Sequence, residues 1–328
     1  MIRLPLVEID SLVVDYLASR GKVRAVEDVS FYLEKGEKLG LAGESGSGKS
    51  TLGLSLLRLV PYPGIIVKGC IKIDETDIAK LPEHEMRSIR GKKVAYIFQD
   101  PMTSLNPVKR IGAHFVELIR THEPTVSKED ALERAKTMLK NLGILPERIN
   151  DYPHQFSGGM RQRIMIGLAI ALNPDLVIAD EPTTALDVIV QAKILDLLEN
   201  LRKIYGMALI LISHDLSILL ERCDKITVMY AGHMFEYASS IELHKAPKHP
   251  YTQGLLQSIP NIEVTDQKLS AIPGSPPNML NPPKGCRFWP RCSYAKEICR
   301  VKEPTLIDIG HNHLVRCVLY SEKGAECE

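Results

Sequence analysis

The stretch Gly43-Glu44-Ser45-Gly46-Ser47-Gly48-Lys49-Ser50-Thr51 decides the fold of this chain of 328 residues. It follows an apolar run and fits the pattern G-x-x-x-x-G-K-[ST], in which backbone N–H groups surround a phosphate chain. In this pattern Lys49 neutralises phosphate oxygens and the hydroxyl of Ser50 ligates Mg²⁺. A glycine turn without function does not need all three fixed positions directly after a strand. The stretch therefore predicts an α/β fold that binds a nucleoside triphosphate with Mg²⁺.

A second glycine motif, Ser157-Gly158-Gly159, precedes an apolar stretch from Ile164 to Leu172 that we interpret as a helix. The unpaired N–H groups and the dipole at the start of a helix make an anion site. One nucleotide needs only one phosphate-binding loop. The additional motif therefore predicts a nucleotide held between two subunits.

Polar residues follow three further apolar runs, and parallel strands bring such positions to one edge of a sheet. Asp180 is placed to hold Mg²⁺ through water, and Glu181 beside it to act as general base. His214 is expected to face the γ-phosphate, and the amide of Gln99 to contact Mg²⁺ and the attacking water. An isolated Asp-Glu pair is more often a solvated turn, and an isolated histidine more often caps or packs. Their order after the phosphate-binding loop favours the catalytic roles.

This order of motifs resembles the ATP-binding cassette of ABC transporters: Walker A, Q-loop, signature, Walker B, D-loop at 185–187 and switch histidine. Three strings look like the ATPase subunits of oligopeptide and dipeptide importers. They are QDPMTSLNP (99–107), FSGGMRQR (156–163) and HKAPKHPYTQGLL (244–256). The resemblance runs from about Leu4 to Tyr320. It departs from the general cassette at the signature, where Phe156 and Met160 replace leucine and glutamine, as is usual in the peptide-importer group.

The resemblance implies an α/β P-loop NTPase fold, an ABC cassette with a β-subdomain, a helical subdomain and a C-terminal metal-binding extension. Two cassettes would close head to tail, so that the signature of each meets the ATP held on Lys49 of the other. Tyr16 would stack on adenine, although an aromatic residue in a strand needs no such role. The implied partners are a second ABC ATPase subunit, the same chain or a related one, two transmembrane permease subunits and an extracytoplasmic substrate-binding protein. The segment 99–107 would transmit closure to the permeases.

The composition agrees with a large globular chain: 45% of the residues are hydrophobic. The chain contains 41 lysine and arginine residues and 40 acidic residues. Because these charges nearly balance, the composition gives no reason to expect a nucleic-acid partner. No apolar run approaches the ~20 residues that span a bilayer. Glu8 and Asp10 interrupt the opening stretch, which therefore lacks a secretory signal. We expect a peripheral protein on the cytoplasmic face of the cell membrane.

The patterning predicts four segments. Residues 1–98 form the nucleotide-binding core with its β-subdomain, 99–172 the helical subdomain with the signature, and 173–237 the rest of the core. Ser127 to Asp130 looks like a capping box that starts a helix. Residues 238–328 form the extension, and proline clusters after Tyr237 predict an extended, loop-rich chain there.

Four of the seven cysteines, Cys286, Cys292, Cys299 and Cys317, lie in this extension. Cys70 and Cys223 are interpreted as strand or core residues and Cys327 as part of a frayed terminus. A disulfide framework is disfavoured in the reducing cytosol. Zinc accepts four thiolates, but its structural sites usually contain close C-x₂₋₄-C pairs, which the first three cysteines do not form. Four thiolates also suit a [4Fe–4S] cluster, and the resemblance to importer subunits that bind one ranks iron–sulfur first, zinc second and no metal third.

Three alternative functions remain at this point. A non-transport ABC ATPase acting on DNA would carry long coiled coils within the cassette, and one acting on ribosomes would carry two cassettes. A redox protein would use the cluster to cycle electrons. Relatives of the peptide importers also move oligosaccharides or nickel, so the substrate stays open.

Overall fold

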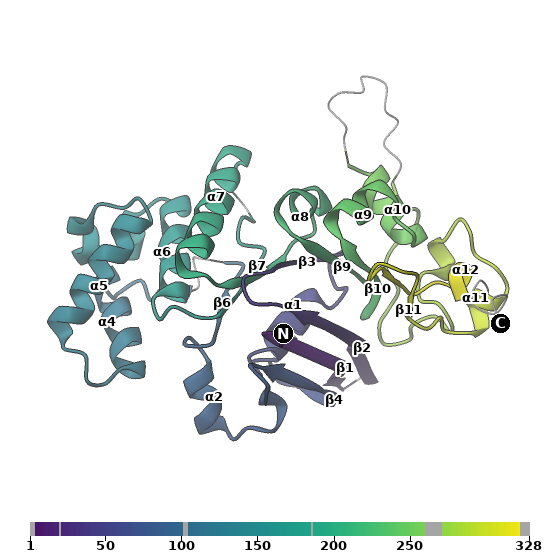
Figure 1. Ribbon diagram of the computed structural model, residues 1–328, viewed down its shortest axis with the longest axis horizontal. Coiled ribbons are helices and arrows are strands. Elements are labelled where there is room, and N and C mark those ends of the chain that lie inside the picture. Colours follow the sequence, from purple (N-terminus) through teal and green to yellow (C-terminus); the bar gives the residue numbers. More distant parts are fainter. Residues whose placement is uncertain (1–3, 20, 101–103, 185, 260–270, 322–328) are drawn as a thin grey trace. The chain divides into compact units, whose positions relative to one another are not determined.

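The structure, a computed structural model, describes residues 4–19, 21–100, 104–184, 186–259 and 271–321 (Figure 1). It divides into two compact units. Unit 1 combines residues 1–33, 38–79 and 211–328, and unit 2 combines residues 34–37 and 80–210. Residues 101–103 of the predicted transmission segment, Ala185 of the predicted D-loop and Cys327 lie outside the described residues.

Unit 1 contains the antiparallel sheet that the alternating pattern of the first hundred residues predicts. Its strand order is β2-β1-β4-β5, and β1 pairs with both long neighbours. Exposed residues continue the ladder at the ends of β1 and β2. Their bounds are Val7–Ala18 (β1), Gly21–Leu33 (β2), Gly64–Ile73 (β4) and Thr76–Asp77 (β5).

A second run of strands in unit 1 has the order β11-β12-β10-β9-β3. Strand β3 (Lys38–Ala42) lies parallel to β9 (Lys225–Tyr230), and both are almost entirely buried, as a strand covered on both faces requires. β10 (His233–Ser239) pairs antiparallel with β9 and with β12 (Leu314–Val315), which pairs in turn with β11 (Ile307–Asp308). The helices of this unit are α1 (Lys49–Ser55), α8 (Leu216–Arg222), α9 (Ser240–Lys245), α10 (Pro250–Gln257), α11 (Ile298–Val301) and α12 (Val318–Ser321).

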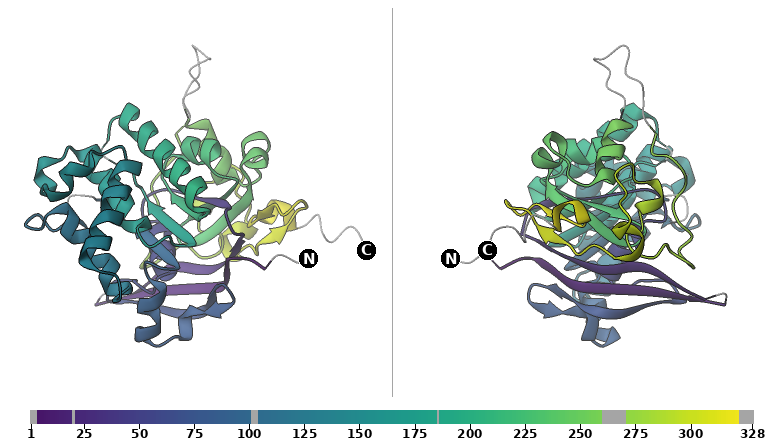
Figure 2. Two further views of the ribbon diagram at one scale, coloured as in Figure 1. Left: turned by 60° about the vertical axis from the view of Figure 1, so that its left-hand side comes forward. Right: turned by 90° about the vertical axis from the view of Figure 1, so that its right-hand side faces the viewer.

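The chain after Tyr237 is not loop-rich from its start, which corrects the prediction. Helices α9 and α10 come first, and local caps explain them. Ser239 accepts a hydrogen bond from the N–H of Glu242 at 3.2 Å, and Nδ1 of His249 accepts one from the N–H of Tyr251 at 3.0 Å. The loop-rich part follows, and β12 joins it to the edge of β10 (Figure 2, yellow and green).

Unit 2 contains the strands β6 (Val94–Ile97) and β7 (Leu176–Asp180), which pair in parallel, and several helices. Strand β8 (Ala208–Ile212) carries the chain from this unit to unit 1. The helices are α2 (Glu83–Ile89), α4 (Ile111–His122), α5 (Lys128–Asn141), α6 (Gly158–Ile170) and α7 (Val188–Tyr205).

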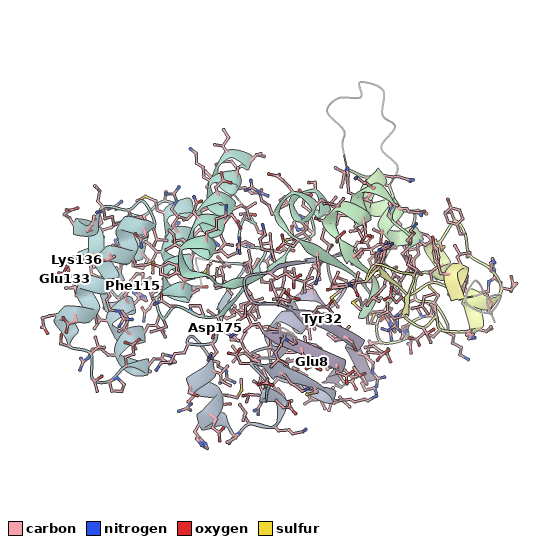
Figure 3. The ribbon with its side chains drawn as sticks, in the orientation of Figure 1. Glu8, Tyr32, Phe115, Glu133, Lys136 and Asp175 are labelled. Atoms are coloured by element: carbon pink, nitrogen blue, oxygen red, sulfur yellow. The ribbon has the colours of Figure 1, made fainter. Side chains whose placement is uncertain are left out.

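The helical part of unit 2 follows its sequence signals closely. Ser127 caps α5 as predicted, since its Oγ accepts a hydrogen bond from the N–H of Asp130 at 3.0 Å. Phe115 of the neighbouring α4 is fully buried, whereas Glu133 and Lys136 form a surface ion pair on α5 (Figure 3). No helix among the described residues has the length and apolar character needed to cross a membrane.

Candidate active site

The phosphate-binding loop of unit 1 links β3 to α1, and its glycines are required by close backbone contacts. Gly43 and Gly48 have φ angles of 143° and 103°, in the region that side chains rarely adopt. A Cβ on Gly43 would lie 2.1 Å from the carbonyl oxygen of Met229, and one on Gly48 2.2 Å from that of Ala25. The loop can therefore take this path only with glycine at both positions.

Lys49 begins α1 and is almost fully buried beneath the loop. Its Nζ donates to the carbonyl oxygens of Gly43 at 2.7 Å and of Glu44 at 3.0 Å. Ser50, the predicted Mg²⁺ ligand, follows it and is exposed. The ammonium group is thus held on the loop that the motif assigns to the phosphates.

Two more predicted residues lie near this loop in unit 1. The hydroxyl of Tyr16 lies 3.4 Å from Oγ1 of Thr51, so the end of β1 reaches the last residue of the motif. His214 is exposed in the turn between β8 and α8. The N–H of Ser213, one residue earlier, donates to the carbonyl of Leu41 at 3.1 Å, which places this turn beside the strand that enters the loop.

In unit 2, Asp180 ends β7 and is 6% exposed. Its Oδ2 accepts a hydrogen bond from the hydroxyl of Tyr96 at 2.7 Å, whereas its buried Oδ1 has no hydrogen-bond partner among the described residues. A buried carboxylate oxygen without a partner is costly unless a cation or water satisfies it. The donor set therefore fits the predicted role in holding Mg²⁺.

Glu181 occupies a left-handed backbone conformation, with φ of 44°, directly after the strand. Its Oε2 accepts hydrogen bonds from Nε2 of Gln99 at 3.0 Å and from Oγ1 of Thr184 at 2.9 Å. The structure thus brings together two residues that lie 82 positions apart and that the sequence assigns to the same water. Sequence reasoning missed Thr184 and Tyr96, although a hydroxyl three residues after Glu181 was a visible signal.

The signature motif opens α6 as predicted, but the helix starts at Gly158, earlier than the apolar stretch indicates. Ser157 is its N-cap, and its Oγ accepts a hydrogen bond from the N–H of Met160 at 3.4 Å. Arg148 supports both residues that depart from the general cassette. Its guanidinium lies 4.0 Å from the ring centre of the buried Phe156, and its Nη1 lies 3.8 Å from Sδ of Met160.

The four cysteines of the extension line one cavity in unit 1. Cys286 and Cys299 are joined by a backbone hydrogen bond of 2.9 Å, and the aromatic rings of Phe288 and Trp289 help to close the cavity. Tetrahedral zinc with Zn–S bonds of about 2.3 Å would bring all four sulfurs to about 3.8 Å from one another. The cavity is lined by four thiols, a side chain that binds both single metal ions and metal clusters.

Two thiols of this cavity, those of Cys286 and Cys317, resist ionisation. Burial, together with the neighbouring cysteines, raises the pKa of Cys286 to about 12 and that of Cys317 to about 11. Metal ions reverse this preference because they bind the thiolate form. A cation in this cavity would therefore stabilise the charged form of its buried thiols.

A second polar cluster joins Glu27, His233 and Glu303, whose ligand atoms lie within 4.8 Å of one another. Arg287 already binds the carboxylate of Glu27, and Arg316 approaches that of Glu303 at 3.8 Å. Burial opposes ionisation of Glu27, yet its hydrogen bonds and the arginine charge lower its pKa below the ordinary value. We interpret this cluster as an ion-pair network that fastens the extension to β2 and β10.

A loop for phosphates, a carboxylate with one unsatisfied oxygen, a glutamate paired with a glutamine and a helix-capping signature together define an ABC ATPase. Comparison with known proteins agrees. Residues 26–184 match the ABC transporter family, and residues 235–299 match the oligopeptide/dipeptide transporter C-terminal region. A dimeric structure of the cassette MJ0796 in a post-hydrolysis state, bound to ADP and Pi, aligns with a TM-score of 0.62 and 28% identity, covering 71% of this chain and 98% of that one.

The relatives narrow the family further. The chain is 46% identical to the oligopeptide transport ATP-binding protein OppD of Bacillus subtilis, over 95% of its own length and 88% of the relative. It is 44% identical to AppD of the same organism, over 98% of both chains, and 42% identical to the dipeptide transport protein DppD of Escherichia coli, over 95% and 96%. The chain belongs to the oligopeptide/dipeptide family of ABC transporter ATP-binding subunits.

Proposed function

We propose that this chain hydrolyses ATP to power an importer of dipeptides or oligopeptides. The observation that carries the proposal is the joint match of the cassette and of the C-terminal region, together with relatives of near-equal length that bear oligopeptide and dipeptide transport names. A cassette that acts on DNA or ribosomes has no reason to carry the transporter C-terminal region. This region therefore favours transport over the non-transport alternative.

The proposed chemistry assigns one task to each predicted residue. Lys49 neutralises phosphate charge with its ammonium group, and the N–H groups of the loop orient the phosphate chain. When bound through Ser50, Gln99 and Asp180, Mg²⁺ would offset the charge that develops on the phosphate oxygens. Glu181 accepts the proton of the attacking water, which Gln99 and His214 help to orient.

Hydrolysis is proposed to occur in a closed pair of cassettes. Ser157-Gly158-Gly159 of each would donate hydrogen bonds to the ATP held by its partner, and the dimeric structure of the related cassette MJ0796 supports such a pair. Hydrolysis would reopen the pair, and the segment 99–107 would pass the change to two transmembrane permease subunits. With an extracytoplasmic binding protein delivering substrate, the chain would work at the cytoplasmic face of the membrane.

The four cysteines are proposed to hold a [4Fe–4S] cluster, with zinc as the alternative. Four cysteines line one cavity, and four thiolates are the ligand set that such a cluster takes. The surrounding chain is short of apolar side chains for a core of its own, so the cluster would serve as a structural staple. Its ligands would be Cys286, Cys292, Cys299 and Cys317.

Cys299→Ser is expected to bleach the protein. Anaerobically purified wild type should be brown and contain iron and acid-labile sulfide, because four thiolates satisfy the cluster, and loss of one ligand should release it. The measurement is metal and sulfide content, with proteolysis of the extension as a second readout. Cys70→Ser, in strand β4, is the matched control and should keep the colour. Colourless wild type with stoichiometric zinc would replace the cluster by zinc, and a metal-free protein with a protease-resistant extension would exclude both.

Transport is tested on the native complex. After purification and identification of its subunits, the complex is reconstituted into vesicles with its binding protein, and uptake of labelled dipeptides, oligopeptides, nickel and oligosaccharides is measured. Peptide uptake that stops in a Glu181→Gln complex would support the proposal. A binding protein that retains only nickel or an oligosaccharide would move the chain to another substrate within the family.

A further inference from the structure

Two residues from outside the cassette motifs hold Glu44, the second residue of the Walker A loop. Arg291 donates from Nη1 to Oε2 of Glu44 at 2.8 Å and from Nη2 to Oε1 at 3.0 Å. The hydroxyl of Tyr251 accepts the backbone N–H of Glu44 at 3.0 Å. Glu44 is thus bound at both its side chain and its backbone by the C-terminal part of the chain.

Arg291 is itself fixed in place. Its side chain is 7% exposed, against 25% for Glu44, so the pair is shielded from water on the arginine side. Its Nη1 also lies 3.2 Å from the hydroxyl of Tyr230, and its guanidinium lies over the Tyr230 ring. Tyr230, Tyr251 and Phe288 pack against one another with ring centres 4.7–5.3 Å apart. These three packed rings therefore hold the guanidinium in its contact with Glu44.

The contact reaches the residue that binds phosphate. Nζ of Lys49 donates to the carbonyl oxygen of Glu44, so a shift of that peptide group moves an acceptor of the ammonium. The charge of Arg291 also favours ATP binding. A carboxylate within a phosphate-binding loop repels a triphosphate, and Arg291 cancels it with a bidentate pair. The pair thus both fixes the loop and removes a repulsion.

We propose that Arg291, assisted by Tyr251, is a positioning residue for ATP binding that acts through Glu44 and couples the segment Cys286–Cys292 to the Walker A loop. A second contact supports the coupling. Arg287, next to Cys286, donates to the carbonyl of Ala231, and the N–H of the following Gly232 donates to the carbonyl of Ser47 at 2.9 Å. Both arginines between the first two cysteines therefore contact the loop or its support. The proposal rests only on ATP binding by this loop.

Arg291→Met is expected to weaken ATP binding by about 10-fold, within the 5- to 150-fold range of typical coupling between sites. The measurement is the Kd of the full-length chain for ATP, with steady-state kinetics of the complex. KM should rise while kcat at saturating ATP stays near wild type, because neither residue touches the reacting water. A fall in kcat with unchanged KM, or an unchanged Kd, would overturn the proposal.

A double-mutant cycle separates positioning from mere support of the fold. Glu44→Gln keeps the shape of the side chain and removes its charge, so Arg291→Met should weaken ATP binding in the wild type but have little further effect in the Glu44→Gln background. Arg300→Met is the matched control. Arg300 belongs to the same extension but lies over the Trp289 ring and pairs with Glu297, so its loss should leave Kd unchanged. An equal loss of affinity on Arg291→Met in both backgrounds would mean that Arg291 does not act through Glu44, and would overturn the proposal.

Coupling between sites is reciprocal, which gives a readout independent of turnover. Saturating ATP should slow protease cleavage within residues 286–301 of the wild type. The protection should disappear in Arg291→Met and persist in Arg300→Met. Equal protection in all three proteins would contradict coupling through Arg291, whereas a wild type that binds no ATP would instead contradict the proposed ATPase function.

Discussion

Glu181→Gln should lower ATP hydrolysis by ~10²-fold or more, within the range expected for loss of a general base. Glutamine keeps the size of the side chain and still accepts the hydrogen bonds from Gln99 and Thr184, but it cannot accept a proton at neutral pH. ATP binding should persist, so closed dimers should accumulate. Phosphate release and size-exclusion chromatography with ATP measure the two effects.

The matched control is Glu133→Gln. Glu133 also lies in unit 2, but it pairs with Lys136 on the surface of α5 at 2.6 Å. Its loss should leave turnover unchanged, because a surface pair contributes little. Wild-type turnover in Glu181→Gln would remove Glu181 from the proposed mechanism.

Ser157→Arg should abolish ATP-driven dimerisation. A bulky cation at the exposed cap of α6 would occupy the position proposed for the partner's phosphates. The nucleotide affinity of the monomer should stay nearly intact, since the motif is proposed to act only on the ATP of the other subunit. Sedimentation with and without ATP, in the Glu181→Gln background, measures the outcome.

Ser127→Arg is a close control for this variant. Ser127 caps α5 as Ser157 caps α6, so both variants lose a cap worth ~1 kcal/mol. Only the signature variant should lose dimerisation. If instead ATP binding to the monomer collapses in Ser157→Arg and not in Ser127→Arg, the motif acts within its own chain and the head-to-tail arrangement is wrong.

The sequence predicted those strands, caps and helix starts that depend on residues close together in the chain. The strand before the phosphate loop, the cap at Ser127 and the start of a helix at Ser157-Gly158-Gly159 all depend on residues within a few positions of one another. The pairing of Gln99 with Glu181 was also predictable, because both follow apolar strands and parallel strands align their ends.

Long-range polar contacts and short helices could not be predicted from the sequence. Glu44 and Arg291 lie 247 positions apart, and no spacing rule joins an acidic residue in a glycine loop to one arginine among many. Helices α9 and α10 are six and eight residues long, and their proline and histidine neighbours resemble a loop. Their capping residues, rather than their apolar pattern, carried the helical signal. The bounds of the four predicted segments and the metal of the cysteine site stay predictions.

Because Arg148 contacts several residues of the signature loop, this loop can be exchanged between cassettes only together with Arg148. Arg148 contacts the ring of Phe156 and the sulfur of Met160, donates to the carbonyl of Gln155 at 2.9 Å, and pairs with Asp151 at 2.8 Å. A chimera that imports the general leucine and glutamine without changing position 148 would leave the guanidinium without the aromatic ring on which it now lies. The two departures from the common cassette sequence therefore form one contact unit with an arginine eight residues upstream of Phe156.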